Sequence, residues 1–409
     1  MDFLKRSIKK RGFVNTIIYA IVSVFYYLIR LIYSKILDSI EVKNDYVLFY
    51  STPDFYDNAF IFYKYISSKK YKIIWLINDK KSFLDDENVK TIQFSSKMHT
   101  GPTLKSLYYT SKSKYIFYTH VSPIQGISSK KEQIIINLWH GCGYKNDVKS
   151  NEKYINRNYF DYVLVPGNLF IDTKAKFFGC KKEQILPIGY PRYDVLLNEN
   201  EYTKKFVTNF KKGKKLVVWM PTFRKTIDGL FPEEKSNGYD IPIMDSDDDF
   251  KSLDNICKKN NIILCIKRHP FQISYSAEKL NLSNIFFVDN DYFKNNKLEL
   301  YSFLRYSDAL ITDYSSVAVD YLLLNKPIAF ILSDYNDYLG SRGFVFENPL
   351  EYMPGYHIYT LNEFNSAIID IANNKDIYAK QRKKIIDKMH NTCDNYCERI
   401  EKKIFSLKK

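Results

Sequence analysis

The stretch DALITDYSSVAVDYLLLNKPIAFILSD, residues 308–334, decides the fold. An apolar run, Ala309–Thr312, has the length of a buried strand, and a helical pattern that opens with Ser315 and Ser316 follows it. A second apolar run, Ile328–Leu332, closes a strand–helix–strand unit. The start of such a helix presents free backbone N–H groups that suit a phosphate, although a simple capping role explains the same residues equally well.

The same alternation of apolar runs and helical patterns divides the chain into two halves. Strands are expected in the first half at Tyr46–Tyr50, Ile73–Ile77, Tyr115–Thr119, Ile134–Leu138 and Tyr162–Val165. In the second half they are expected at Leu216–Met220, Ile262–Ile266, Ile285–Val288, Ala309–Thr312 and Ile328–Leu332. Strands that alternate with helices indicate parallel sheets. The polar, lysine-rich stretch 198–215 separates the halves, so the sequence predicts an α/β protein with two Rossmann-like domains, residues 41–200 and 213–374, facing one cleft.

Both ends of the chain are basic. Of the formal net charge of +15, residues 1–40 carry +5 (7 − 2) and residues 375–409 carry +6 (11 − 5). The first end also contains Phe13–Ile29, an apolar run rich in Tyr and Phe, which favours an anionic membrane surface as partner over nucleic acid. We expect residues 375–409 to form a charged C-terminal helix.

The apolar run near the N-terminus has three possible structures. We predict that residues 1–40 form a helix lying in the cytoplasmic leaflet of the cell membrane, as in a peripheral or monotopic protein. A helix that spans the membrane and a helix buried against the domain are the alternatives. The six cysteines form no CxxC pair and no metal-ligand spacing is present, which indicates a reducing compartment.

Polar and basic residues follow four of the expected strands. They are Trp139-His140-Gly141-Cys142-Gly143, Pro221-Thr222-Phe223-Arg224, Lys267-Arg268-His269-Pro270 and Asp313-Tyr314-Ser315-Ser316. Because ligands gather at the carboxyl ends of parallel strands, we expect these turns to line the cleft between the domains. Four other histidines lack such a setting and are expected to be structural or solvated: His99, His120, His357 and His390.

Seven motifs in one order carry a family resemblance. They are WHG (139–141), GYPR (189–192), PTFR (221–224), KRHP (267–270), DYSS…D (313–320), KPIAF (326–330) and RGF (342–344). Over about residues 45–350 the chain resembles the CDP-glycerol glycerophosphotransferases, the teichoic-acid primases and polymerases of Gram-positive bacteria. The resemblance implies a GT-B fold, a C-terminal helix that packs back on the first domain, and peripheral attachment to the membrane. The chain departs from the family after WHG, where Cys142-Gly143-Tyr144-Lys145 replaces the usual Thr-Pro-Leu-Lys.

The resemblance also implies a reaction and a set of site residues. Glycerol phosphate would pass from CDP-glycerol to a hydroxyl of a lipid-linked glycan acceptor, and CMP would be released. His140 matches a general base, and His269 matches a histidine near the donor diphosphate. The matched donor-binding positions are Arg192, Pro221, Thr222, Lys267, Ser315, Ser316 and Asp320. Their neighbours Gly141, Cys142, Gly143, Arg224, Arg268 and Asp313 complete the expected site.

The sequence leaves alternatives for the reaction. The donor is open between CDP-glycerol, CDP-ribitol and another CDP-polyol, and a GT-B glycosyltransferase that uses a nucleotide sugar has the same fold. A non-catalytic scaffold on the membrane is a further alternative. No cofactor or metal is expected, because protein cations can stabilise the leaving phosphate.

Overall fold

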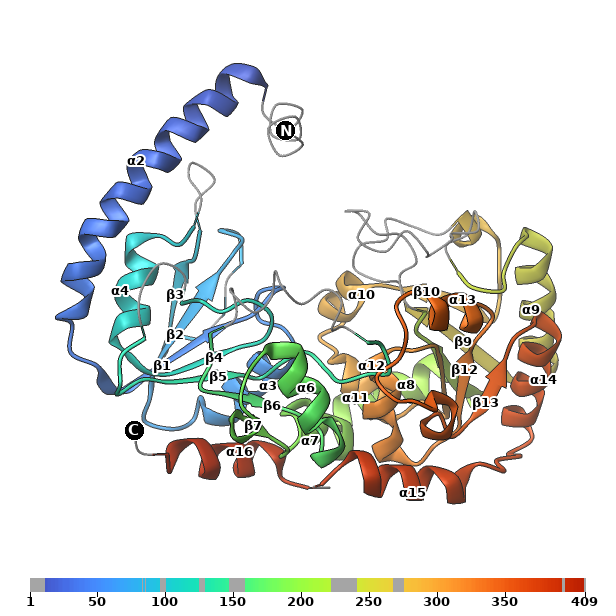
Figure 1. The fold of residues 1–409 in the computed structure, drawn as a ribbon. Coiled ribbons are helices and arrows are strands. Elements are labelled where there is room, and N and C mark those ends of the chain that lie inside the picture. The colour runs from blue at the N-terminus through green and yellow to red at the C-terminus, as the bar shows by residue number, and fades with distance from the viewer. Residues whose placement is uncertain are drawn as a thin grey trace.

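The computed structural model describes residues 12–82, 84, 86–95, 101–124, 129–146, 159–221, 241–267, 276–391 and 394–407. Two sheets, both flanked by helices, lie side by side (Figure 1). The strand pairs in both sheets are parallel. This arrangement confirms the predicted pair of Rossmann-like domains.

The first sheet has seven strands in the order β3-β2-β1-β4-β5-β6-β7. They are β1 (Lys43–Tyr50), β2 (Lys72–Ile77), β3 (Val89–Gln93), β4 (Ser113–Tyr118), β5 (Ile134–Asn137), β6 (Tyr162–Leu164) and β7 (Ile185–Leu186). Strands β4 and β5 are buried almost throughout, as expected for apolar runs with helices on both faces. The helices of this domain include α3 (Asp57–Ile66), α4 (Leu104–Lys112) and α6 (Ile171–Phe178).

The second sheet has six strands in the order β10-β9-β8-β11-β12-β13. They are β8 (Lys215–Trp219), β9 (Ile262–Lys267), β10 (Ile285–Val288), β11 (Ala309–Thr312), β12 (Ile328–Ile331) and β13 (Tyr356–Ile358). Its helices include α9 (Asp247–Lys259), α10 (Asn290–Asn295), α11 (Leu300–Arg305), α12 (Ser316–Tyr321), α13 (Tyr335–Gly340) and α14 (Leu361–Ala372). The strand order reverses between β8 and β11, which creates the crevice where such sheets bind ligands.

The stretch between the sheets and the C-terminal end are more regular than expected. Helices α7 (Arg192–Leu197) and α8 (Glu201–Lys211) lie between the two sheets in the chain. The prediction of one C-terminal helix is wrong, because the chain forms α15 (Ala379–Met389) and α16 (Tyr396–Phe405) with a break between them. Asn395 has a φ of 49° there, which interrupts the helical path. Helix α16 packs on the first domain, where the Phe405 ring stacks on Tyr115 with centroids 4.2 Å apart.

The acidic run 247–249 lies at the start of a helix rather than in a loop. These residues form the first turn of α9, where the Asp249 N–H donates to the Ser246 hydroxyl and the Asp249 carboxylate accepts the Ser246 N–H. Carboxylates at this position are stabilised by the positive end of the helix.

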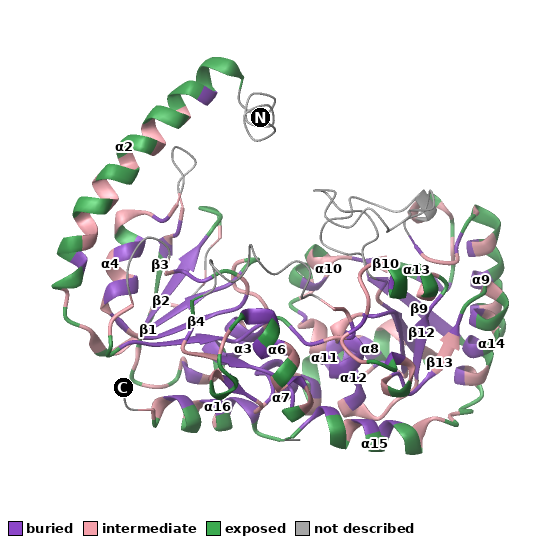
Figure 2. Ribbon diagram, in the orientation of Figure 1, coloured by how far each residue is buried: buried purple, intermediate pink, exposed green. Residues whose placement is uncertain are grey.

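Helix α2 (Phe13–Asp38) stands along α4 at the edge of the molecule (Figure 1). Its inner side touches the first domain, where the Tyr26 hydroxyl donates to the Pro102 carbonyl at 3.4 Å and Arg30 lies against Gly101. Its outer side is apolar and exposed (Figure 2), with Val14, Ile18, Ile21, Phe25, Leu28, Ile32 and Ile36 at helical spacing. By length and composition α2 is long and apolar enough to cross a membrane. Only 6% of its most apolar 18-residue stretch is buried in the protein. The alternative of a helix buried against the domain is therefore wrong.

Candidate active site

The glycine-rich turn after β5 reaches across to the second domain. A Cβ atom on Gly141 would lie 2.6 Å from the Ser316 Oγ, and one on Gly143 would lie 2.9 Å from the Ser316 backbone nitrogen. Gly141 also has a φ of 136°, a backbone region that residues with a side chain rarely adopt. Both glycines are therefore required for the close approach of this turn to the start of α12.

Residues 139–146, which we call the crossing turn, continue into the second domain. The Val345 N–H donates to the Tyr144 carbonyl at 2.8 Å, and the Asn146 N–H donates to the Gly343 carbonyl at 3.1 Å. The Tyr144 side chain is fully buried, and its hydroxyl donates to the Tyr352 carbonyl at 3.0 Å. Gly343 of the RGF motif and the nearby Val345 thus hold the crossing turn through backbone hydrogen bonds.

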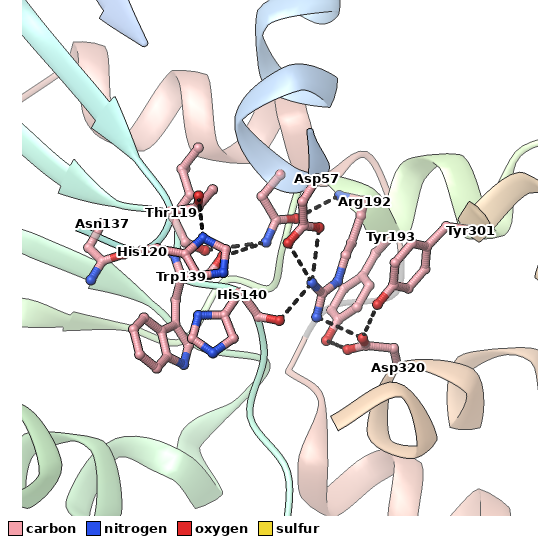
Figure 3. Close-up of polar contacts among 12 residues, drawn as sticks. Asp57, Thr119, His120, Asn137, Trp139, His140, Arg192, Tyr193, Tyr301 and Asp320 are labelled. Carbon is pink, nitrogen blue, oxygen red and sulfur yellow. Dashed lines mark hydrogen bonds and ion pairs between the residues drawn. The ribbon is translucent and has the colours of Figure 1, made fainter. Parts of the chain in front are cut away.

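A buried arginine joins the domains beside the crossing turn (Figure 3). Arg192, at the start of α7, donates to both Asp57 carboxylate oxygens at 3.0 and 3.1 Å and to the His140 carbonyl at 2.9 Å. Its other terminal nitrogen donates to the Asp320 carboxylate at 2.7 Å, and the hydroxyls of Tyr193 and Tyr301 donate to the same carboxylate at 2.6 Å. Burial of all three charged groups makes this network a rigid link between the domains.

His140 follows β5 and is exposed as a residue, although protein atoms surround much of its ring. The ring stacks on that of His120 with centroids 4.5 Å apart and planes 4° apart, and it contacts Trp139 with centroids 3.9 Å apart (Figure 3). His120 follows β4, the strand next to β5, so two neighbouring strand ends bring both imidazoles to the cleft. The stack fixes the plane of the His140 ring.

The surroundings of His140 favour its neutral form. Desolvation lowers its pKa well below the usual value, and the positive charges of His120, Lys174 and Arg192 act in the same direction. A hydrogen bond to the Thr119 carbonyl acts in the opposite direction. His140 is therefore unprotonated at neutral pH, the state in which an imidazole accepts a proton.

Lys267 ends β9 at the carboxyl edge of the second sheet. Its side chain is 6% exposed and its ammonium group donates to the Asn290 side-chain oxygen at 3.0 Å. Burial lowers its pKa to about 8, while the negative charge of Asp289 acts in the opposite direction. A cation held with so little water is a strong partner for an anionic ligand.

The structure places the other expected residues as follows. Ser315 and Ser316 are half-buried at the start of α12, and Pro221 and Asp313 are buried at the ends of strands β8 and β11. Cys142 is fully buried with its Sγ 3.2 Å from the Tyr190 hydroxyl, so it faces the protein interior. Arg192 and Asp320 bind each other, and their contact with a donor stays a prediction. Thr222, Arg224, Arg268 and His269 lie outside the described residues.

Sequence reasoning missed several residues of this site. His120 follows a predicted strand as His140 does, so the same rule of strand ends could have found it. Asp57, Tyr193 and Tyr301 gave no such signal, because their roles arise from contacts between distant segments. Within the described part of the chain, no three His, Cys, Asp or Glu side chains group as ligands for a metal.

Two Rossmann-like domains around one cleft, with a helix that returns to the first domain, define the GT-B class of transferases. The chain belongs to the CDP-Glycerol:Poly(glycerophosphate) glycerophosphotransferase family, whose sequence profile matches residues 32–406. The fold is shared with the wall teichoic acid polymerase TagF, with a TM-score of 0.73 and 21% identity over 96% of this chain and 97% of that one.

Curated relatives include enzymes for two different polyols. The chain is 28% identical over 320 residues to the teichoic acid ribitol-phosphate polymerase TarL of Staphylococcus aureus, covering 73% of this chain and 52% of that protein. It is 28% identical over 282 residues to the teichoic acid glycerol-phosphate primase of Bacillus subtilis, covering 63% of this chain and 65% of the primase. The chain thus spans about half to two thirds of the length of these relatives.

Proposed function

We propose that this protein transfers glycerol phosphate from CDP-glycerol to a hydroxyl group of a lipid-linked acceptor, with release of CMP. The observation that carries the proposal is the position of His140, whose ring adjoins the contact between the crossing turn and the start of α12. A base on one side of the cleft and phosphate-binding groups on the other match a reaction that joins two substrates.

The proposed step forms one bond to phosphorus and breaks another. The acceptor oxygen attacks the phosphorus that bears glycerol, the bond from that phosphorus to the CMP oxygen breaks, and His140 takes the hydroxyl proton. Lys267 and the hydroxyl and N–H groups of Ser316 would stabilise the negative charge that develops on the leaving CMP. His269 would assist at the same phosphate, as the family resemblance predicts. These protein groups supply the positive charge, so the proposed step needs no bound metal or cofactor.

The choice of glycerol over ribitol belongs to the proposal, because relatives of both kinds match the chain. The test is to incubate the purified protein with CDP-glycerol or CDP-ribitol and a lipid-linked acceptor, and to measure CMP and the mass of the product. We expect CMP only with an acceptor present and faster with CDP-glycerol. CMP formed faster from CDP-ribitol would reassign the donor, and a nucleoside diphosphate formed from a nucleotide sugar would indicate a glycosyltransferase.

The proposal includes attachment to the cytoplasmic face of the membrane through α2. Its apolar outer side has no partner among the described residues, while Arg30 and Tyr26 face the first domain. A helix with one apolar side fits a position in the plane of the interface. There it would hold the cleft close to a lipid-linked acceptor.

A further inference from the structure

A cavity lies between the domains, away from the crossing turn. It has a volume of about 680 Å³, within the range of sites for small ligands. The loops after β1 and β2 form its wall in the first domain, and α10 with residues 298–300 forms its wall in the second. No group described above as part of the proposed reaction lines it.

The walls combine aromatic surface with a negative balance of charge. Four of the lining residues are Phe55, Tyr56, Phe60 and Phe293. The charged lining residues are Asp54, Asp79, Asp291, Glu299, Lys81 and Lys294, a sum of −2 (2 − 4) in a chain of net charge +15. This balance disfavours phosphate, whereas flat apolar surface with hydrogen-bonding groups suits an uncharged ring that carries hydroxyls.

The first-domain wall is pre-formed. The Asp54 carboxylate accepts the Asn78 N–H at 2.8 Å and the Asp79 N–H at 2.9 Å, so it ties the loop after β1 to the loop after β2. In the opposite wall Asp291 is exposed at the first turn of α10 and has no hydrogen bond or ion pair with a described residue. The Asp54 carboxylate thus holds the cavity wall in place, and the Asp291 carboxylate is available to a ligand.

The cavity adjoins the proposed reaction centre at two points. Asn290, on its wall, accepts the hydrogen bond from Lys267 at 3.0 Å. Tyr56, also on its wall, directly precedes Asp57, the partner of Arg192 at 3.0 Å. A ligand in the cavity therefore extends toward the cleft where the phosphate would react.

We infer that this cavity binds the uncharged, hydroxyl-rich part of the acceptor, a sugar unit next to the hydroxyl that reacts. The inference rests on the proposed function, because that function makes the bound sugar part of an acceptor. Binding of an uncharged sugar can be tested without catalysis. The loops of the first domain supply most of the lining, which separates this site from the phosphate-binding groups at the strand ends of the second domain.

The experiment measures binding of N,N′-diacetylchitobiose, an uncharged disaccharide, and of CMP by NMR titration. Ser82→Trp fills the cavity from its wall, and Asp291→Ala removes the unpaired carboxylate. Asp337→Ala is the matched control, because Asp337 is also exposed in the first turn of a six-residue helix, α13. We expect disaccharide binding to be lost in Ser82→Trp, about tenfold to a hundredfold weaker in Asp291→Ala, and unchanged in Asp337→Ala. CMP affinity should stay within about twofold in all three.

Three outcomes would overturn the inference: no disaccharide binding by the unmodified protein, equal binding by Ser82→Trp, or loss of CMP affinity in Ser82→Trp. The last would assign the cavity to the donor nucleoside. Failure of the proposed function is a separate result, since it would appear as absence of CMP release from CDP-polyols in the unmodified protein.

Discussion

At the scale of single residues, the proposed chemistry centres on His140. Its ring is fixed by the stack on His120, and its neutral form is favoured by desolvation and nearby positive charge. General-base catalysis contributes about 10²–10⁴-fold to a rate. We therefore expect His140→Ala to lower kcat by about that factor and to leave the Kd for CDP-glycerol near normal, as measured by steady-state kinetics and calorimetry. A variant with unchanged kcat would exclude His140 as the base.

The lowered pKa of His140 also predicts a pH profile. Because the base must be unprotonated, kcat/KM should stay constant as the pH falls through 6.5 and decrease only at lower pH. His120→Phe keeps a flat ring for stacking but removes an imidazole whose protonation at low pH would disfavour protonation of His140. The acid limb of the profile should then move upward, toward pH 6.5. Identical profiles for both proteins would show that His120 does not influence the base.

The lowered pKa of Lys267 predicts how the affinity for CDP-glycerol changes at alkaline pH. Its ammonium form, which we propose binds the donor phosphate, decreases as the pH rises through a pKa of about 8. The affinity for CDP-glycerol should therefore weaken as the pH rises above that value, by up to roughly tenfold per pH unit, until binding by the protein with a neutral lysine sets the limit. Calorimetry between pH 7 and pH 9 measures this change, and Lys267→Met should bind weakly with no such dependence. A pH-independent affinity in the unmodified protein would place the diphosphate elsewhere.

The sequence predicted single residues only where a local rule applied. His140, Lys267 and Ser316 follow apolar strands, so their place at the cleft could be inferred from strand ends. Arg192 was selected from a motif, yet its partners Asp57 and Asp320 come from distant segments, 135 and 128 residues away. Such a pairing depends on tertiary contacts that spacing along one chain does not show.

At the scale of secondary-structure elements, α2 is a mostly exposed helix in which only Thr16 and Leu37 are buried. Its outer side exposes large apolar residues, among them Ile21 at 64% and Phe25 at 65%. Burial of such a side chain in the lipid interface gains about 1.5–3 kcal/mol, which is lost if the position carries a charge.

Ile21→Glu should therefore weaken binding to vesicles of 30% phosphatidylglycerol and 70% phosphatidylcholine by about tenfold or more. Co-sedimentation measures the bound fraction. The control is Ile369→Glu, which places the same charge at an apolar residue of α14 that is 40% exposed. Equal sedimentation of the two variants would mean that α2 does not hold the protein at the membrane.

The elements themselves were largely predictable where apolar runs were long. All ten expected strands are present, because buried parallel strands have near-continuous apolar sequences. Strands β3, β7 and β13 were missed, because β3 is mostly polar (VKTIQ) and the other two have only two and three residues. The break between α15 and α16 was missed because an asparagine in a left-handed conformation left no pattern in a charged stretch.

At the scale of the whole molecule, Arg192 holds the two domains through buried charges. Replacement by methionine would leave the Asp57 and Asp320 carboxylates buried without their cation, which costs about 3–5 kcal/mol. We expect Arg192→Met to shift the urea midpoint strongly. Arg399→Met is the control, because the Arg399–Asp394 pair is exposed and should contribute less than about 1 kcal/mol. Similar urea midpoints for the two variants would show that the buried ion pairs of Arg192 do not stabilise the protein.

The crossing turn has a consequence for how the two domains can move. It joins the second domain through backbone hydrogen bonds to Gly343 and Val345, whereas an exposed ion pair, Lys64–Glu299, joins the domains beside the cavity between them. Backbone hydrogen bonds hold two segments more firmly than an exposed ion pair does. We therefore expect relative motion of the domains to separate Lys64 from Glu299 first, while His140 and Ser316 stay near each other. In the proposed reaction, substrates would then enter and leave without disturbing the alignment of the reacting groups.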